Sequence, residues 1–313
     1  RTGASEIVID DPRVEDVLVG TMFPAHLEAK AVQALHVLAA GAGYGAGYRP
    51  DHLVGVRAAV NALVRCLFPE PVGDPDLSGS VALEGYDYVH PVKVTTLSLL
   101  VGRLLGLSEA DLVRLGLVAM LQNVGYLQLP PGLLETPGPL NEEQRVYLEG
   151  HPMASVDLLK DAGLDDAVLA GIAQHHERWN GSGYPTRLKG NAISIFARIT
   201  AIADAFHALV SKRPHRPPMK RHEAIEFISA FSGELFDPEL ASLFTRRIPV
   251  YPAGIGVKLN TGEVGIVSNP NIGHIARPVV RVCVANGRPV QEPYDLDLSQ
   301  VENMNKLIAE VIL

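Results

Sequence analysis

Residues 172–185 read IAQHHERWNGSGYP, and the interpretation of the whole chain starts from this stretch. Its two adjacent histidines, His175 and His176, close an apolar segment whose pattern predicts a helix over 165–177. A glycine-rich loop that ends in Gly-Tyr-Pro follows directly, and these are residue types of a tight turn. The side chains of two adjacent histidines point in different directions, so both rings serve one site only where that site lies between them. The stretch therefore indicates a metal centre, with an ordinary pair of buried histidines as the alternative.

The sequence on both sides of this stretch is predominantly helical. Apolar residues recur at helical spacing over about 24–68 and, helix after helix, over about 81–235. A segment rich in Pro, Gly and Asp at 69–79 separates the two regions and marks a domain boundary. These patterns predict a mainly α fold.

Beyond residue 236 the periodicity changes to that of strands. Residues 256–267 predict a hairpin with its turn at Asn-Thr-Gly, and residues 278–285 predict a third strand. A short helix over about 299–312 is expected to close the chain. The prediction thus comprises three parts: an N-terminal helical region (1–78), a central helical domain (79–248), and a small β extension with a terminal helix (249–313).

Composition narrows the class of protein. The 313 residues are 47% hydrophobic and carry a net charge of −8, which argues against a general nucleic-acid binder. No apolar run reaches the roughly 18 residues that span a bilayer, so no membrane span is expected. The first residues show no signal-peptide pattern, and the two cysteines lie far apart in apolar surroundings. A cytoplasmic protein with free thiols is expected.

Histidines and one aspartate are the candidate metal ligands. Asp204 lies on a predicted helix that is otherwise too apolar to solvate a carboxylate. Four histidines are expected near helix ends of the central domain: His90, His151, His175 and His176. Imidazoles and carboxylates that converge inside a helical bundle commonly bind transition metals. A single buried histidine is more often a hydrogen-bonded core residue, and a buried aspartate can cap a helix, so both interpretations stay open for each residue taken alone.

Several stretches in a fixed order resemble the HD-GYP domain of bacterial cyclic-di-GMP signalling, a branch of the HD metallophosphohydrolases. They are His-Pro at 90–91, EGHP at 149–152, HHERWNGSGYP at 175–185, IADAFHAL at 202–209 and RPHR at 213–216. The resemblance covers some 130 residues and implies an HD-type helical bundle. Residues 250–313 resemble the small β extension that trails some members of the family.

The resemblance also implies a set of metal ligands. Members hold a di- or trinuclear iron-type centre. The positions of their ligands that survive here are His90, His151, His175, His176 and Asp204.

Other positions of the family's site carry different residues here. The His-Asp pair that names the family falls on Gln122 and Asn123, and a lysine thought to assist phosphodiester cleavage falls on Tyr126. Asn180 and His207 replace two further aspartates. An amide carries no charge and only one ligating oxygen, so it is a poor substitute for a carboxylate that bridges two divalent cations.

These replacements predict a partial site. We expect one divalent transition metal (Fe, Mn, Ni or Zn) on His151, His175 and His176, with His90 and Asp204 left from a second metal position. A binuclear centre and an intact catalytic set are not expected.

The side of the site that binds the nucleotide is better preserved. By resemblance, Arg213 and Arg216 hold the phosphates of the cyclic dinucleotide, and the guanidinium fork suits phosphate oxygens. Gly183, Tyr184 and Pro185 form a rigid loop that completes the binding face. The alternative is that the basic run around the two arginines is only a solvated loop.

Three hypotheses on function follow. The first is a catalytically degenerate HD-GYP protein that binds cyclic-di-GMP or a protein partner as receptor or regulator, without hydrolysis. The second is a residual metal-dependent phosphodiesterase that hydrolyses cyclic-di-GMP to pGpG or GMP. The third is a protein-protein interaction module whose partner is, for example, a diguanylate cyclase; a homodimer is also considered.

Overall fold

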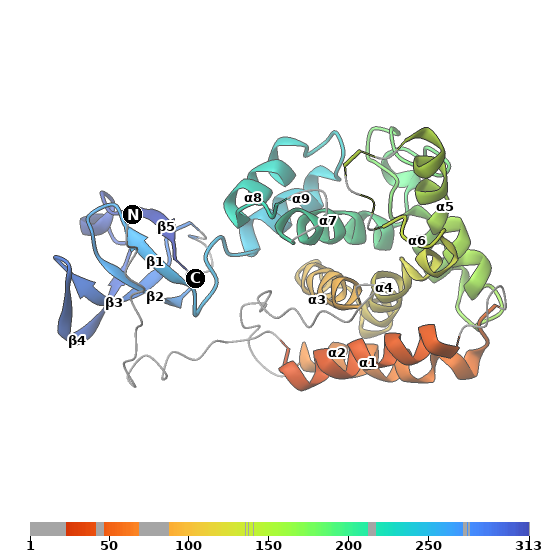
Figure 1. Ribbon diagram of the computed structural model, residues 1–313, viewed down its shortest axis with the longest axis horizontal. Helices are drawn as coiled ribbons and strands as arrows, with labels where there is room; N and C mark the ends of the chain where they lie inside the picture. Colours follow the sequence, from red (N-terminus) through yellow and green to blue (C-terminus); the bar gives the residue numbers. More distant parts are fainter. Residues whose placement is uncertain are drawn as a thin grey trace. The chain divides into compact units, whose positions relative to one another are not determined.

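The computed structural model describes residues 23–41, 47–68, 88–134, 136, 138–139, 141–211, 217–271, 274 and 276–312. They form two compact units, a helical unit within 23–245 and a β unit within 246–312 (Figure 1). A mainly α fold with a small C-terminal sheet is therefore confirmed.

The helical unit follows the predicted periodicity closely. Its elements are α1 (Ala25–Gly41), η1 (Pro50–Leu53), α2 (Val54–Cys66), α3 (Val89–Leu104), α4 (Glu109–Leu121), η2 (Val124–Gln128), α5 (Glu142–Leu159), α6 (Asp166–Gln174), η3 (Gly190–Ala192), α7 (Ile195–Val210), α8 (Arg221–Ala230) and α9 (Pro238–Arg247). Within the described ranges, no helix is both long enough and apolar enough to cross a membrane.

Local sequence signals set where these helices begin. The side chain of Ser108 caps α4 by accepting from the backbone N–H of Asp111 at 3.1 Å. Asn141 caps α5 in a reciprocal box with Gln144. Asp165 caps α6 by accepting from the backbone N–H of Val168 at 2.9 Å. These caps fix the register of α5 and α6, the two helices that carry the histidines of the site.

The core of the helical unit lies around α3, α4 and α7, which pack on one another. α3 is buried along nearly its whole length, so it is a central helix. The helices α1 and α2 pack on α3 and α4, and a Cβ at Gly116 of α4 would lie 2.6 Å from a methyl group of Val60 on α2. The described part of the predicted N-terminal region thus belongs to the same compact unit as the central helices.

The β unit is a five-stranded antiparallel sheet in the order β4-β3-β2-β1-β5. Its strands are β1 (Gly256–Leu259), β2 (Val264–Asn269), β3 (Val279–Ala285), β4 (Arg288–Asp297) and β5 (Ile308–Val311). The predicted hairpin and third strand are confirmed as β1, β2 and β3. Their buried valines, among them Val257, Val267 and Val280, pack in one small cluster.

The predicted terminal helix over 299–312 is wrong. This segment holds a short 3-10 turn, Val301–Asn303, followed by β5, which pairs with the edge of β1. The side chain of Asn260 fixes this pairing, because it accepts from the backbone N–H of Leu307 at 2.8 Å and donates to the carbonyl of Asn305 at 3.0 Å. The backbone hydrogen bonds that this segment makes with β1 outweigh its weak local preference for a helix.

Strand β4 was not predicted from the sequence. The Asn-Gly pair at 286–287 was interpreted only as the end of a strand, whereas both residues have positive φ angles, 53° and 71°, and make a two-residue hairpin turn. Pro289 and Pro293 weaken the strand signal of β4, and proline is tolerated there because β4 is an edge strand.

Candidate metal centre

His151 lies on α5 at a point where the sequence breaks the helix's own hydrogen bonding. Pro152 has no N–H, so the carbonyl of Leu148, four residues earlier, lacks its helical donor. The Nδ1–H of His151 donates to this carbonyl instead. Because a carbonyl can only accept, the proton of the neutral ring is on Nδ1, and Nε2 keeps its lone pair.

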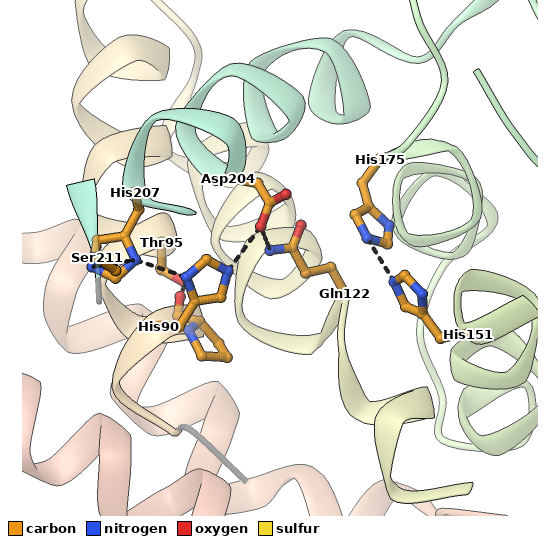
Figure 2. Close-up of polar contacts among 9 residues, drawn as sticks. His90, Thr95, Gln122, His151, His175, Asp204, His207 and Ser211 are labelled. Atoms are coloured by element: carbon orange, nitrogen blue, oxygen red, sulfur yellow. Dashed lines mark hydrogen bonds and ion pairs between the residues drawn. The ribbon is translucent and has the colours of Figure 1, made fainter. Parts of the chain in front are cut away.

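His175 is oriented in the same way at the end of α6. The helix ends at Gln174, so the carbonyl of Ile172 lies in the last turn, where no helical donor is available. The Nδ1–H of His175 donates to this carbonyl at 2.7 Å. Its Nε2 therefore also keeps a lone pair, and it faces the Nε2 of His151 at 3.2 Å (Figure 2).

A third histidine completes the group, which we call the three-histidine cluster: His151, His175 and His176. Each ring offers a nitrogen, and the three nitrogens lie within 4.8 Å of one another. Two lone pairs that face each other repel unless a cation lies between them. Two nitrogens that bind one tetrahedral cation at about 2.0–2.1 Å lie about 3.3 Å apart. The spacing of His151 and His175 therefore fits a shared metal ion.

Burial keeps these rings neutral. It lowers the pKa of His151 to about 3 and that of His175 to about 4, from a usual value of 6.5. Burial also lowers the pKa of His176 well below the usual value, and the proximity of His175 acts in the same direction. Neutral imidazole is the form that binds a metal ion, so the cluster is ready to bind at neutral pH.

Two tyrosines pack on the cluster. The ring of Tyr184 stacks on His176 with centroids 4.9 Å apart, and the ring of Tyr126 lies 4.4 Å from that of His151. Burial raises the pKa of Tyr184, so its phenol keeps its proton. These contacts restrict the rotation of the two imidazoles and add no charge to the site.

Two uncharged amides lie beside the cluster. Gln122 and Asn123 follow α4, and η2 packs tightly on α5, since a Cβ at Gly125 would lie 2.2 Å from the carbonyl oxygen of His151. Ser155 of α5 fixes this contact by donating to the carbonyl of Gln122 at 2.8 Å and accepting from the N–H of Gly125 at 2.8 Å. The side-chain oxygens of Gln122 and Asn123 are buried and, in the part of the chain that the structure describes, have no hydrogen-bond partner.

Such oxygens are costly to bury unpaired, and a bound cation would satisfy them. The three neutral imidazoles form a donor set that fits a divalent transition metal.

Asp204 belongs to a second group of polar side chains. Its Oδ1 lies 2.8 Å from Nε2 of His90 and accepts from the amide of Gln122 at 3.3 Å. The other ring nitrogen of His90 lies 2.7 Å from Nδ1 of His207, and the hydroxyl of Ser211 lies 3.3 Å from the His207 ring. Figure 2 shows this chain of contacts running from Ser211 to Gln122 beside the three-histidine cluster.

The charge of Asp204 is stabilised within this group. Burial acts to raise its pKa, but the hydrogen bond and charge of His90 outweigh burial and hold the pKa well below its usual range. Asp204 is therefore ionised, and it is paired with His90 rather than drawn into the three-histidine cluster. The structure thus divides the five predicted ligands into a convergent group of three and a separate pair. Whether His90 and Asp204 bind metal stays a prediction.

The Gly-Tyr-Pro loop is held against the cluster by Glu177 and Gly183. The buried carboxylate of Glu177 accepts from the N–H and hydroxyl of Thr186, both at 2.7 Å, and from the N–H of Leu188 at 3.0 Å. A Cβ at Gly183 would lie 2.4–2.5 Å from backbone atoms of 176–178, so only glycine fits. The importance of Glu177 was missed in the sequence, although an acid placed directly after two histidines was a signal for it.

Not every predicted site residue can be placed. Arg213 and Arg216 lie outside the described residues. Tyr184 and Pro185 lie in the loop beside His176, as the sequence order requires, and their role in binding a ligand stays a prediction.

Comparisons of the sequence with known proteins identify the family to which these site residues belong. The HD domain family model matches residues 77–240. A cyclic di-GMP phosphodiesterase of Pseudomonas aeruginosa is 29% identical over 71% of this chain and 54% of its own length. The cyclic di-GMP phosphodiesterase response regulator RpfG of Xanthomonas campestris is 36% identical over 47% of this chain and 39% of its own length. The chain thus spans about half the length, or less, of these curated relatives.

A solved structure shows the same fold. It is the structure of a HDG"Y"P protein from Bdellovibrio bacteriovorus, which superposes with a TM-score of 0.52 at 17% identity and covers 77% of this chain and 73% of its own. At this identity the likeness concerns the fold alone. The matched family model, the curated relatives and the helical fold lead to one conclusion: this chain belongs to the HD domain family, in its HD-GYP branch.

Proposed function

We propose that this chain binds cyclic-di-GMP at a centre that holds one metal ion, and that it acts as a receptor or regulator in cyclic-di-GMP signalling. The observation that carries the proposal is the convergence of His151, His175 and His176, whose ligand atoms lie within 4.8 Å of one another. The curated relatives named above are cyclic di-GMP phosphodiesterases, which supports the class of ligand.

The three histidines would hold a divalent transition metal (Fe, Mn, Ni or Zn), with the amide oxygens of Gln122 and Asn123 beside it. When bound, such an ion supplies Lewis-acid attraction for a phosphate oxygen. A second ion is disfavoured because Asn123 brings no negative charge to offset the repulsion between two cations. The pairing of His90 with Asp204 also supports a single ion, since Asp204 already has a hydrogen-bonded partner.

The chain's own residues then bind and orient the nucleotide. The loop with Gly183, Tyr184 and Pro185 lies against His176 and would form one wall of the ligand site. By resemblance to the family, Arg213 and Arg216 would hold phosphate groups. Tyr126, which packs on His151, could donate a hydrogen bond to the ligand but carries no positive charge.

A second candidate is hydrolysis of cyclic-di-GMP to pGpG or GMP. The observation that favours it is that the curated relatives are named as phosphodiesterases. It requires that one metal ion and the surviving side chains suffice for cleavage. A protein partner such as a diguanylate cyclase, a homodimer and a cytoplasmic location are further proposals, and they rest on the resemblance to the family.

Calorimetry with cyclic-di-GMP tests binding. We expect micromolar or tighter binding to metal-loaded protein, and absence of heat at high micromolar ligand, with or without added metal, would reject the proposal. Elemental analysis of freshly purified protein is expected to find about one transition metal per chain.

Chromatography of the nucleotide after prolonged incubation separates receptor from enzyme. Turnover that disappears in both His175→Ala and His176→Ala, and persists in the matched control His26→Ala on the exposed side of α1, would establish hydrolysis. An unchanged nucleotide pool, together with binding in the calorimetric titration, supports the receptor.

A further inference from the structure

The guanidinium of Arg178 is a buried cation that neither the metal centre nor the loop contacts described above use. Its Nη1 is buried and, across the ranges the structure describes, has no hydrogen-bond partner. The guanidinium carbon lies 5.8 Å from the ring centroid of Phe236, a contact that supports the flat face of the group but satisfies none of its N–H donors. The backbone on either side is fixed, because the N–H groups of Trp179 and Asn180 donate to the carbonyls of 235 and 234. A buried charged donor without an acceptor is costly, so an acceptor outside the chain is implied.

Arg178 follows His176 by two residues, and its charge interacts with the groups of the metal centre. Burial lowers the pKa of Arg178, and the negative charge of Asp204 acts to raise it. Tyr184 and Glu177 act in the same direction as Asp204 but more weakly. The guanidinium stays protonated at any ordinary pH. In turn its charge acts to lower the pKa of His175 and of His176. Arg178 is thus close enough to the three-histidine cluster to influence whatever binds there.

The neighbouring carboxylates already have other donors. Asp204 accepts from His90 and Gln122, and Glu177 accepts from the backbone and side chain of the Gly-Tyr-Pro loop. Within the described ranges neither carboxylate hydrogen-bonds to Arg178, so the Nη1 donor stays available. A cation beside a metal site weakens the binding of the metal ion and strengthens that of an anion.

We propose that Arg178 is a phosphate-binding residue of the three-histidine cluster, whose guanidinium donates to an oxygen of a phosphate or phosphodiester group held there. This inference rests on the proposed function for the identity of the nucleotide, but not for the phosphate group itself. The guanidinium fork suits phosphate oxygens, and the buried position strengthens a charge-assisted hydrogen bond. Arg178 lies two residues after His176, so its backbone is held beside the three-histidine cluster, and the proposed contact does not depend on any basic loop elsewhere.

The test compares the effects of Arg178→Met on metal and on anion binding in the full chain. Co²⁺ serves as the probe metal, because its visible absorption reports the ligands around it, and inorganic phosphate serves as the probe anion. Arg103→Met is the matched control, since Arg103 also stacks on a phenylalanine, at 5.3 Å from the ring of Phe68, in the last turn of α3.

We expect Arg178→Met to lower the phosphate affinity of the Co²⁺-loaded protein about tenfold or more and to leave the Co²⁺ affinity equal or higher. Arg103→Met should change neither. A parallel fall in both affinities, or an unchanged phosphate affinity, would overturn the proposal, because a merely structural role gives one of these results.

Arg178→Lys keeps the inference testable if the methionine variant does not fold. A lysine keeps the charge but loses the fork, so the phosphate affinity should fall at least about threefold while the Co²⁺ affinity is kept. Equal losses of both affinities would count against the proposal.

The same titrations with cyclic-di-GMP separate the two proposals. If wild-type protein binds phosphate in an Arg178-dependent way but does not bind cyclic-di-GMP, the proposed function fails and this inference stands. If cyclic-di-GMP binds and neither it nor phosphate depends on Arg178, the inference fails alone.

Discussion

Acid should destabilise the metal-free protein through the three-histidine cluster. In the folded chain the pKa of His151 is about 3 and that of His175 about 4, whereas in the unfolded chain both return to about 6.5. Between pH 6.5 and about 4 the unfolded state therefore binds more protons, so the free energy of unfolding falls as the pH falls. Above pH 6.5 neither state binds these protons, and the contribution of the two rings is constant.

The size of the effect follows from the difference in pKa. Below pH 6.5 each ring lowers the free energy of unfolding by about 1.4 kcal/mol per pH unit. At pH 5 the loss is about 2 kcal/mol for one ring and about 4 kcal/mol for the two rings together. His176 changes the free energy in the same direction. Because whole domains are stable by only about 5–15 kcal/mol, the helical unit should lose a large part of its stability between pH 7 and pH 5.

Urea denaturation of metal-free protein, followed by the circular dichroism of the helices at pH 7 and pH 5, measures this loss. His151→Gln removes one of the titrating rings, so its loss should be smaller than that of the wild type by about 2 kcal/mol. His26→Gln removes an exposed histidine of α1 and serves as the control. Equal losses in His151→Gln and wild type, or a wild type equally stable at both pH values, would refute the reasoning.

Three further predictions concern the neighbourhood of the cluster. Gly183→Ala should destabilise the protein by about 2 kcal/mol or more in thermal or urea unfolding, since the new Cβ meets three backbone atoms of residues 176–178. Gly150→Ala on the open face of α5 should instead stabilise it by about 0.5–1 kcal/mol, and equal effects of the two substitutions would contradict the crowding at Gly183. Glu177→Gln should cost about 1–3 kcal/mol, because an amide accepts fewer of the loop's hydrogen bonds, and should make the loop easier to cleave by protease; an unchanged cleavage rate would contradict this role. Gln122→His combined with Asn123→Asp should raise the bound metal from about one to two ions per chain in elemental analysis, and an unchanged stoichiometry would show that the two amides are not what limits the site.

Much of the fold was predictable because the signals for it are local. The caps at Ser108, Asn141 and Asp165 and the helical spacing between them set the helices of the central bundle. The Asn-Thr-Gly turn set the hairpin of β1 and β2. The two errors, a helix expected over 299–312 and the absence of β4, both concern edge strands. β5 pairs with β1, which lies far back in the sequence, and no local pattern encodes that neighbour. β4 pairs with the adjacent β3 through a two-residue turn, but Pro289 and Pro293 weaken its strand signal.

The candidate site was predictable in composition but not in arrangement. The adjacent histidines already implied a focal point, whereas the role of Pro152 in freeing a helix carbonyl for the imidazole of His151 became evident only in the structure. The pairing of Asp204 with His90 was not readable, because the two residues lie 114 positions apart and meet only through the packing of α3 on α7. The buried Nη1 of Arg178, which has no hydrogen-bond partner among the described residues, was likewise invisible, since burial without a partner is a property of packing.

The sequence by itself determined the helical class of the protein, its β extension and the side chains able to bind a metal, because periodicity, caps and residue chemistry act over a few positions. Only the tertiary structure decided which of these side chains meet. It placed the Nε2 atoms of His151 and His175, which are 24 residues apart in sequence, 3.2 Å from each other. It also paired Asp204 with His90, which lies 114 residues earlier. The physical reason is that such convergence depends on how α3, α5, α6 and α7 pack around a shared core, and a packing arrangement is a property of the whole chain rather than of any segment.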